Sequence, residues 1–230
     1  MAAGDITDAL VDELGIRLED ADEAVFTEAT KLLALNRGQV MVCQYLDNHY
    51  LTELETIDDG VGNAGEDISG GSFAFSSLDN TPLKGAEGII ATSVQVGGSG
   101  DFLWATEIDT KRRKRLENTY LVESDVNILY YIYASTIYYE LSTYTSSVAA
   151  IYYLKVPTTM TTDVDPVINT GLHEIMLLFA EGYCWGMDGK LERREKAFES
   201  AKLQCKVLNE KYTPPTEIGT KGRIELGRGD

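Results

Sequence analysis

The side chains most able to bind a metal or to act as nucleophiles are two histidines and three cysteines. Neither His49 nor His173 belongs to an HExxH motif, because His173-Glu174 is followed by no second histidine. We therefore expect both to be ordinary helical residues, not metal ligands. The cysteines lie far apart and have no CxxC spacing: Cys43, Cys184 and Cys205. A disulfide framework or a zinc site is not expected, and a reducing compartment fits the chain better.

Other motifs that could support catalysis are also incomplete. The sequence has no GxSxG, GxxxxGK[ST] or GxGxxG-after-strand pattern. Gly97-Gly98-Ser99-Gly100 is followed by no helix and has no lysine at the phosphate position, so we expect a hairpin turn there. Four carboxylates could coordinate calcium, although they do not match an EF-hand loop: Asp58, Asp59, Glu66 and Asp67. Nothing singles out a carboxylate pair for hydrolysis among the 37 acids, and the sequence predicts neither a cofactor nor an enzyme.

The net charge of −17 is unevenly distributed along the chain. Residues 1–110 contain 21 Asp and Glu against 4 Lys and Arg, whereas residues 111–230 contain 16 of each. All of the excess negative charge therefore belongs to the first half, which should repel nucleic acid. Two interpretations remain open: the charge only keeps the protein soluble, or it forms an acidic surface past which DNA slides without sticking.

One basic cluster stands out against this acidic background. Its members are consecutive: Lys111, Arg112, Arg113, Lys114 and Arg115. Such a cluster suits phosphate contacts, pairing with the acidic half of a neighbouring subunit, or a solvated loop. Of the two functional interpretations, we favour a subunit interface over DNA contact.

The elements that must position these residues begin with helices over residues 1–55. Apolar periodicity predicts a first helix that Gly15 ends. Asp22 is expected to cap a second helix, which Asn36-Arg37-Gly38 should terminate. A third helix is expected from about residue 39 to residue 55.

The middle of the chain changes from loop to strand character. Residues 56–88 are rich in Gly, Asp, Asn and Ser, which predicts a long loop or insertion with a short strand at Ser72–Phe75. Over residues 89–157, β-branched residues and tyrosine dominate, and nine of the 13 tyrosines fall in Tyr120–Tyr153. We expect a four- or five-stranded antiparallel domain. Its tyrosines either pack internally or form a flat aromatic patch for a sugar or a protein partner.

Residues 158–212 return to helical patterns. Asp165 is expected to cap a helix whose first position is Pro166. An apolar stripe continues to Tyr183, Asp188-Gly189 breaks the helix, and a charged helix follows to Tyr212. The two helices should pack as an antiparallel hairpin.

These patterns predict an α+β fold. The N-terminal helices and the C-terminal hairpin would form a helical bundle, the antiparallel β-rich domain would lie between them in the sequence, and residues 213–230 would form an extended tail. A length of 230 residues allows one or two domains. No apolar run reaches the roughly 18–20 residues of a membrane span, and the N-terminus lacks the pattern of a secretory signal.

Three stretches carry a family resemblance: TKLLALNRGQ (Thr30–Gln39), VAAIYYLKVP (Val148–Pro157) and INTGLHEIMLLFAEGYCWGMDGKLERREKAF (Ile168–Phe198). Their order and spacing, which cover most of the chain, resemble the head-to-tail adaptor (connector) proteins of tailed bacteriophages. The glycine-rich stretch 56–88 looks longer than the family minimum and is interpreted as an insertion.

The resemblance implies a structural virion protein without catalytic activity. Such proteins form a ring, usually of twelve copies, that docks under the portal protein at the capsid vertex. The ring extends the channel through which double-stranded DNA passes without sequence-specific binding, and it presents a surface to tail tube or nozzle proteins. The expected location is therefore the neck of the virion, after synthesis in the host cytoplasm, with no membrane partner.

In this picture the extended tail orders along the portal by coupled folding. The portal-contact candidates share this tail: Ile218, Arg223, Ile224, Leu226 and Arg228. Two other classes stay open. One is a hydrolase or lyase acting on polysaccharide, with the Tyr-rich sheet as substrate platform. The other is a soluble protein-binding module unconnected with viruses.

Overall fold

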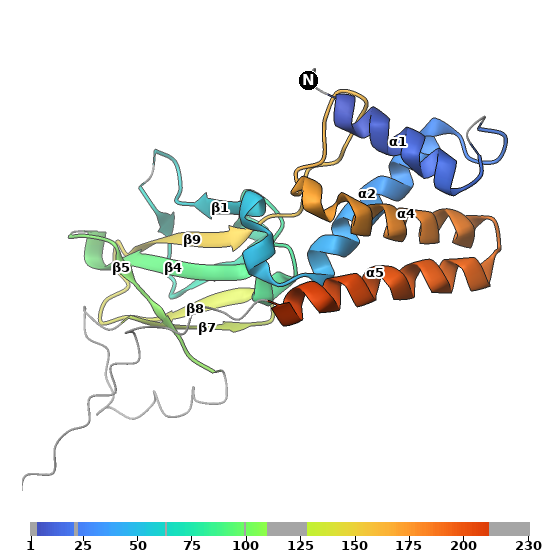
Figure 1. Ribbon diagram of the computed structural model, residues 1–230. Coiled ribbons are helices and arrows are strands. Elements are labelled where there is room, and N and C mark those ends of the chain that lie inside the picture. Colours follow the sequence, from blue (N-terminus) through green and yellow to red (C-terminus); the bar gives the residue numbers. More distant parts are fainter. Residues whose placement is uncertain (1–3, 21–22, 63, 99, 110–127, 212–230) are drawn as a thin grey trace, which may run out of the picture.

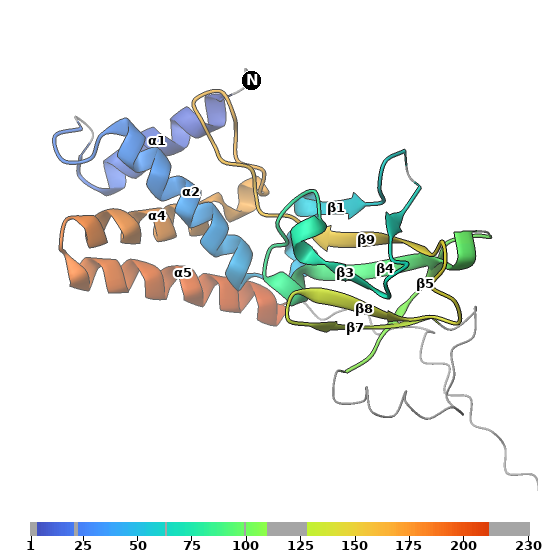
Figure 2. The same ribbon diagram turned by 180° about the vertical axis from the view of Figure 1, so that it is seen from behind.

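The computed structural model describes residues 4–20, 23–62, 64–98, 100–109 and 128–211, and these residues have an α+β fold (Figure 1). The described helices are α1 (Asp5–Arg17), α2 (Glu28–Tyr45), α4 (His173–Met187) and α5 (Leu191–Lys211). They form a helical lobe at one end of the molecule, and two sheets form a β lobe at the other end (Figures 1 and 2). Among the described helices, none combines the length and hydropathy that a membrane span requires.

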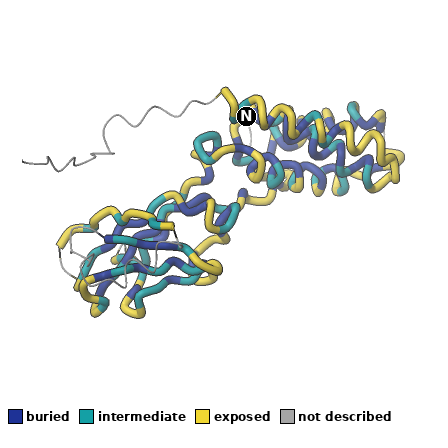
Figure 3. Tube along the Cα trace, turned by 90° about the horizontal axis from the view of Figure 1, so that it is seen from below, coloured by how far each residue is buried: buried dark blue, intermediate teal, exposed yellow. Residues whose placement is uncertain are grey.

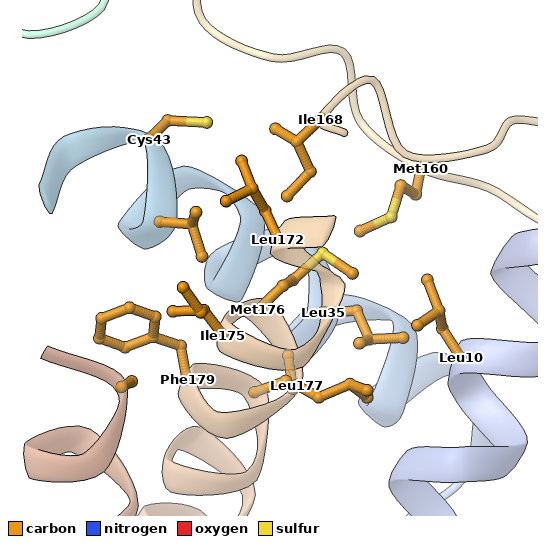
Figure 4. Close-up of a cluster of buried hydrophobic side chains, with 14 of the residues drawn as sticks. Leu10, Leu35, Cys43, Met160, Ile168, Leu172, Ile175, Met176, Leu177 and Phe179 are labelled. Atoms are coloured by element: carbon orange, nitrogen blue, oxygen red, sulfur yellow. The ribbon is translucent and has the colours of Figure 1, made fainter. Parts of the chain in front are cut away.

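The helical lobe is built around α4. Helix α4 packs against α2 on one side and against α5 on another, while α1 packs against both α2 and α4. The buried side chains at these contacts form one continuous core, in which Leu35, Met176 and Phe179 are fully buried (Figure 4). As expected from the sequence, α4 and α5 form an antiparallel hairpin, and Gly189 at the turn has a φ of +74°, which glycine adopts without strain.

Two glycines expected to end helices lie inside them. Helix α1 continues past Gly15 to Arg17, and α2 continues past Gly38 to Tyr45. The predicted third helix is therefore wrong: residues 39–45 belong to α2, and two short 3₁₀ turns follow, η1 (Asn48–Tyr50) and η2 (Thr52–Leu54). A Cβ atom built on Gly38 would lie only 2.5 Å from the carbonyl oxygen of Met176, so this glycine permits close contact between α2 and α4.

The start of α2 also differs from the prediction. Its N-cap is Thr27, whose hydroxyl accepts a hydrogen bond from the Thr30 amide at 3.3 Å. Asp22, the expected cap, lies outside the described residues.

The segment between the last strand and α4 crosses the helical lobe, and polar side chains of α2 hold it there. Asn36 donates to the carbonyl oxygen of Met160 at 3.1 Å and accepts from its amide at 2.7 Å. Gln39 donates to the carbonyl oxygen of Thr158 and accepts from the Val167 amide, both at 3.1 Å. Asn36, expected to help stop a helix, therefore anchors this crossing segment from within α2.

Asp165 caps a different helix from the one predicted. Helix α4 begins at His173, after the 3₁₀ turn η7 (Thr170–Leu172), so Pro166 is not its first residue. The Asp165 carboxylate instead accepts hydrogen bonds from the amides of Ile6 at 3.0 Å and Thr7 at 3.1 Å. These amides belong to the first turn of α1, whose positive end favours a carboxylate.

The β lobe contains two sheets, not the single antiparallel unit expected. The first has the order β1-β9-β4-β5, and β2 also pairs with β9. The second has the order β3-β8-β7-β6 and is mixed, because β6 runs parallel to β7. The first sheet consists of β1 (Glu55–Asp58), β2 (Glu66–Asp67), β4 (Ile89–Gln95), β5 (Leu103–Trp104) and β9 (Val148–Leu154). The second consists of β3 (Ser72–Ala74), β6 (Thr106–Glu107), β7 (Leu129–Tyr133) and β8 (Thr136–Glu140).

The predicted loop over residues 56–88 therefore contributes strands to both sheets. It contains most of β1 and all of β2, neither of which was expected, together with the 3₁₀ turns η3 (Phe75–Ser77) and η4 (Gly85–Gly88). It also contains β3, which confirms the short strand predicted at Ser72–Phe75. A further turn, η5 (Val96–Gly98), follows β4. Strands β1 and β2 are only four and two residues long, too short to show the apolar periodicity by which a strand is recognised in a sequence.

Each lobe has its own core, and β9 joins the two. Ile137, Ile151 and Tyr153 are fully buried between the sheets. Leu154, the next residue of β9, belongs to the core of the helical lobe. Figure 3 shows the buried segments continuing from one lobe to the other along this junction.

Candidate docking surfaces

The residues selected from the sequence as binding sites lie outside the described part of the chain. This applies to the basic cluster, Lys111, Arg112, Arg113, Lys114 and Arg115. It applies equally to the portal-contact candidates, Ile218, Arg223, Ile224, Leu226 and Arg228.

The two histidines occupy separate elements. His49 lies in η1, with its ring 4.0 Å from that of Tyr50. His173 begins α4, and one ring nitrogen lies 3.3 Å from the carbonyl oxygen of Ile168. Burial lowers the pKa of His173, which favours the neutral ring.

Of the four carboxylates considered as calcium ligands, Asp58, Glu66 and Asp67 interact with backbone amides or with one another. Asp58 is buried at the end of β1 and accepts a hydrogen bond from the Asp79 amide at 2.9 Å. Burial and the neighbouring Asp58 raise the pKa of Glu66. The Ser69 amide, which donates to Asp67 at 2.8 Å, lowers the pKa of that carboxylate. Across residues 4–20, 23–62, 64–98, 100–109 and 128–211, no group of three or more His, Cys, Asp or Glu residues could hold a metal ion.

The outer face of the first sheet presents large apolar side chains to solvent. Ile57 on β1 is 50% exposed, Ile90 on β4 is 43% exposed and Trp104 on β5 is 63% exposed. The half-buried Tyr152 of β9 completes this group, which we call the sheet-face patch. Exposed apolar groups of this kind mark surfaces that bind other molecules.

Strand register explains why these side chains meet. Successive residues of a strand point to opposite faces, so Tyr152 must face outward because Ile151 and Tyr153 point into the β core. Ile57 of β1 pairs directly with Tyr152 on the neighbouring β9. On the other side, Trp104 pairs with Ser93 of β4, and its ring centroid lies 5.0 Å from that of Tyr152.

The sheet-face patch encloses a shallow depression of about 370 Å³. Its floor and walls come from three strands in addition to the edge strand that carries Trp104: Glu55, Thr56, Ile57, Ile90, Ala91 and Tyr152. A tilted pair of aromatic rings beside aliphatic groups can receive an apolar side chain of a protein partner, and Glu55 and Thr56 supply a polar edge. The sequence left open whether the strand tyrosines pack internally or form an aromatic patch, and it did not single out Trp104 and Tyr152, whose exposure depends on pairing between distant segments.

Comparison with known proteins does not extend this assignment. No protein-family model matches the chain, and no curated protein matches it either.

Proposed function

We propose that this protein is a subunit of the head-to-tail adaptor ring of a tailed bacteriophage. In this proposal the ring docks beneath the portal protein, extends the DNA channel and provides the attachment surface for the tail. The observation that carries the proposal is the sheet-face patch, an apolar surface left open by a chain that has already buried a separate core in each lobe. The adaptor-like order of sequence segments described above supports the same assignment.

The character of the sheet-face patch favours a protein partner. Trp104 and Tyr152 are large side chains with few rotatable bonds, so ordering them in an interface costs little conformational entropy. Such aromatic anchors carry much of the binding energy in protein interfaces. We assign the patch to contact with a tail tube or nozzle protein, while residues 213–230 contact the portal.

The charge distribution is compatible with passage of DNA. The excess of negative charge in residues 1–110 would keep a DNA duplex from adhering to a channel wall formed by that half of the chain. The proposed location is the neck of the virion.

Electron microscopy of the protein mixed with the portal encoded beside it tests this proposal. We expect a rotationally symmetric ring at one end of the portal, and its symmetry would give the copy number. Deletion of Thr213–Asp230 should leave the circular dichroism spectrum intact and abolish docking. Bare portals in the presence of folded wild-type protein would contradict the adaptor assignment.

A second measurement addresses the sheet-face patch itself. Trp104→Ala should weaken binding of the tail component at least 10-fold, in the range typical of aromatic anchors. Val61→Ala is a matched control, because Val61 is 98% exposed and lies outside the patch. Equal binding by both variants would remove the patch from the interface. If the wild type instead bound a glycan from a screening panel and Trp104→Ala did not, the polysaccharide-acting class would be favoured.

A further inference from the structure

Helices α1 and α5 lie on opposite flanks of the helical lobe. Helix α1 packs against α2 and α4, whereas α5 packs mainly against α4 from the other side (Figures 1 and 2). Each helix therefore leaves one side uncovered. In a closed ring, where every copy uses two different faces, such opposite flanks are suitably placed to meet the neighbouring copies.

The uncovered side of α5 is apolar and positively charged toward its C-terminal end. Leu203 is 61% exposed and Val207 is 39% exposed. From Ser200 onward the helix carries three lysines and a single acid, Glu210. We define the α5 patch as the exposed residues Lys202, Leu203, Lys206 and Val207.

The uncovered side of α1 has the opposite character. Asp8, Asp12 and Ile16 are spaced four residues apart, so they follow one side of the helix, and all three are exposed. Ile16 is 69% exposed. We define the α1 patch as Asp8, Asp12 and Ile16.

We propose that the α5 patch of one copy docks on the α1 patch of the next copy. This proposal rests on the ring assembly proposed above and assigns its subunit contact. Each patch combines exposed aliphatic groups with flanking charges, and the two sets of charges have opposite signs. The aliphatic groups supply contact area, while the charges favour this pairing over α1 against α1 or α5 against α5.

The charges also give the contact a recognisable salt dependence. The flanking charges are exposed, so salt screens their attraction. Assembly should therefore weaken between low and high ionic strength, whereas an interface made only by apolar groups would strengthen in sulfate or phosphate.

Charge reversal provides a decisive test. In the first variant, Lys202→Glu and Lys206→Glu make both patches acidic; in the second, Asp8→Lys and Asp12→Lys make both patches basic. We expect each variant alone to need at least a 10-fold higher concentration than wild type for half-maximal assembly, measured by native mass spectrometry and by ring formation on the portal. An equimolar mixture should recover assembly, because each acidic patch then meets a basic one, and its rings should contain alternating copies.

A matched control separates position from charge. Lys196→Glu changes an exposed lysine on the same side of the helix as Leu203 but about two turns closer to its N-terminus, where it borders the groove toward Arg17 and Glu181. It should assemble like the wild type, whereas Lys206→Glu should not. The proposal is overturned if both charge-reversed variants assemble like the wild type. It is also overturned if both variants remain folded but their mixture fails to assemble.

Cross-linking keeps the proposal testable without the portal and without charge changes. Ile16→Cys and Leu203→Cys alter exposed residues, so neither should disturb the fold. A short bis-maleimide should join the two variants to each other and should join neither variant to itself. If the two cysteine variants were cross-linked to each other but the portals stayed bare, only the adaptor function would be contradicted. If rings formed on the portal but the bis-maleimide did not join the two variants, only the α1–α5 contact would be overturned.

Discussion

Gly38→Ala tests how closely α2 and α4 must approach. Alanine is favoured over glycine within a helix by about 0.5–1 kcal/mol. This gain is opposed by a steric clash, because the new Cβ would lie 2.5 Å from the carbonyl oxygen of Met176 and 3.2 Å from the amide nitrogen of Ala180. Both obstacles are backbone atoms of α4, so no side-chain rotation relieves the clash. The helices must instead separate by about 0.9 Å to bring the shorter contact to an ordinary 3.4 Å.

Overpacking of this kind costs about 1–3 kcal/mol. After subtraction of the helix-propensity gain, we expect Gly38→Ala to lower the free energy of unfolding by about 1–2 kcal/mol. The assay is urea unfolding followed by far-UV circular dichroism, with the slope unchanged and the midpoint lowered.

Gly186→Ala is the matched control for this experiment. The Cβ added there meets the Cδ atom of Arg194 at 3.0 Å, and this exposed, flexible side chain can move away. The control should therefore be neutral, or more stable by up to about 1 kcal/mol. If Gly38→Ala proved as stable as Gly186→Ala, the close approach of α2 and α4 would not be a constraint, and the reasoning would fail.

Three further predictions concern Asp165, Glu66 and the three buried cysteines. Asp165→Ala removes the acceptor for two amides of α1 and should lower the free energy of unfolding by about 1 kcal/mol; an unchanged urea midpoint would contradict the cap. Burial and Asp58 raise the pKa of Glu66, so ionisation of Glu66 weakens the folded state at neutral pH. Glu66→Gln should therefore be more stable than the wild type near pH 7. The difference in the free energy of unfolding should disappear as the pH falls through the folded pKa toward the unfolded value of about 4.3. A difference that stayed constant with pH would contradict a raised pKa for Glu66. Burial also raises the pKa of every cysteine thiol, so a thiol reagent at about pH 8 should label none in the folded protein and all three in denaturant, and rapid labelling of the native protein would contradict this. The pKa values are about 12 for Cys43, about 12 for Cys184 and about 11 for Cys205.

The α+β class and the elements with strong local signals could be predicted from the sequence. Strand β9 and the α4–α5 hairpin follow from β-branched residues, an apolar stripe and the Asp188-Gly189 turn. Such signals are local, because the residues that define each element are neighbours in the chain.

The errors arose where a residue's role depends on a distant partner. Gly38 looks like a helix stop, but the structural reason for a glycine there is the backbone of Met176, far along the chain. Asp165 looks like the cap of the next helix, but its partners are the amides of Ile6 and Thr7. The members of the sheet-face patch could not be selected from the sequence for the same reason, since Trp104 becomes a neighbour of Tyr152 only when β4, β5 and β9 pair.

These distant contacts also connect the surfaces that the proposals use. The chain leaves the sheet-face patch at Tyr152, enters the helical core at Leu154 and then crosses α2, where Asn36 and Gln39 hold it. The same crossing segment ends its path by capping α1 through Asp165. The α1 flank is thus positioned by the segment that emerges directly from the sheet. Fixing one surface relative to the other in this way suits a ring component, because a subunit contact at α1 and a partner contact at the sheet face must be satisfied together by every copy.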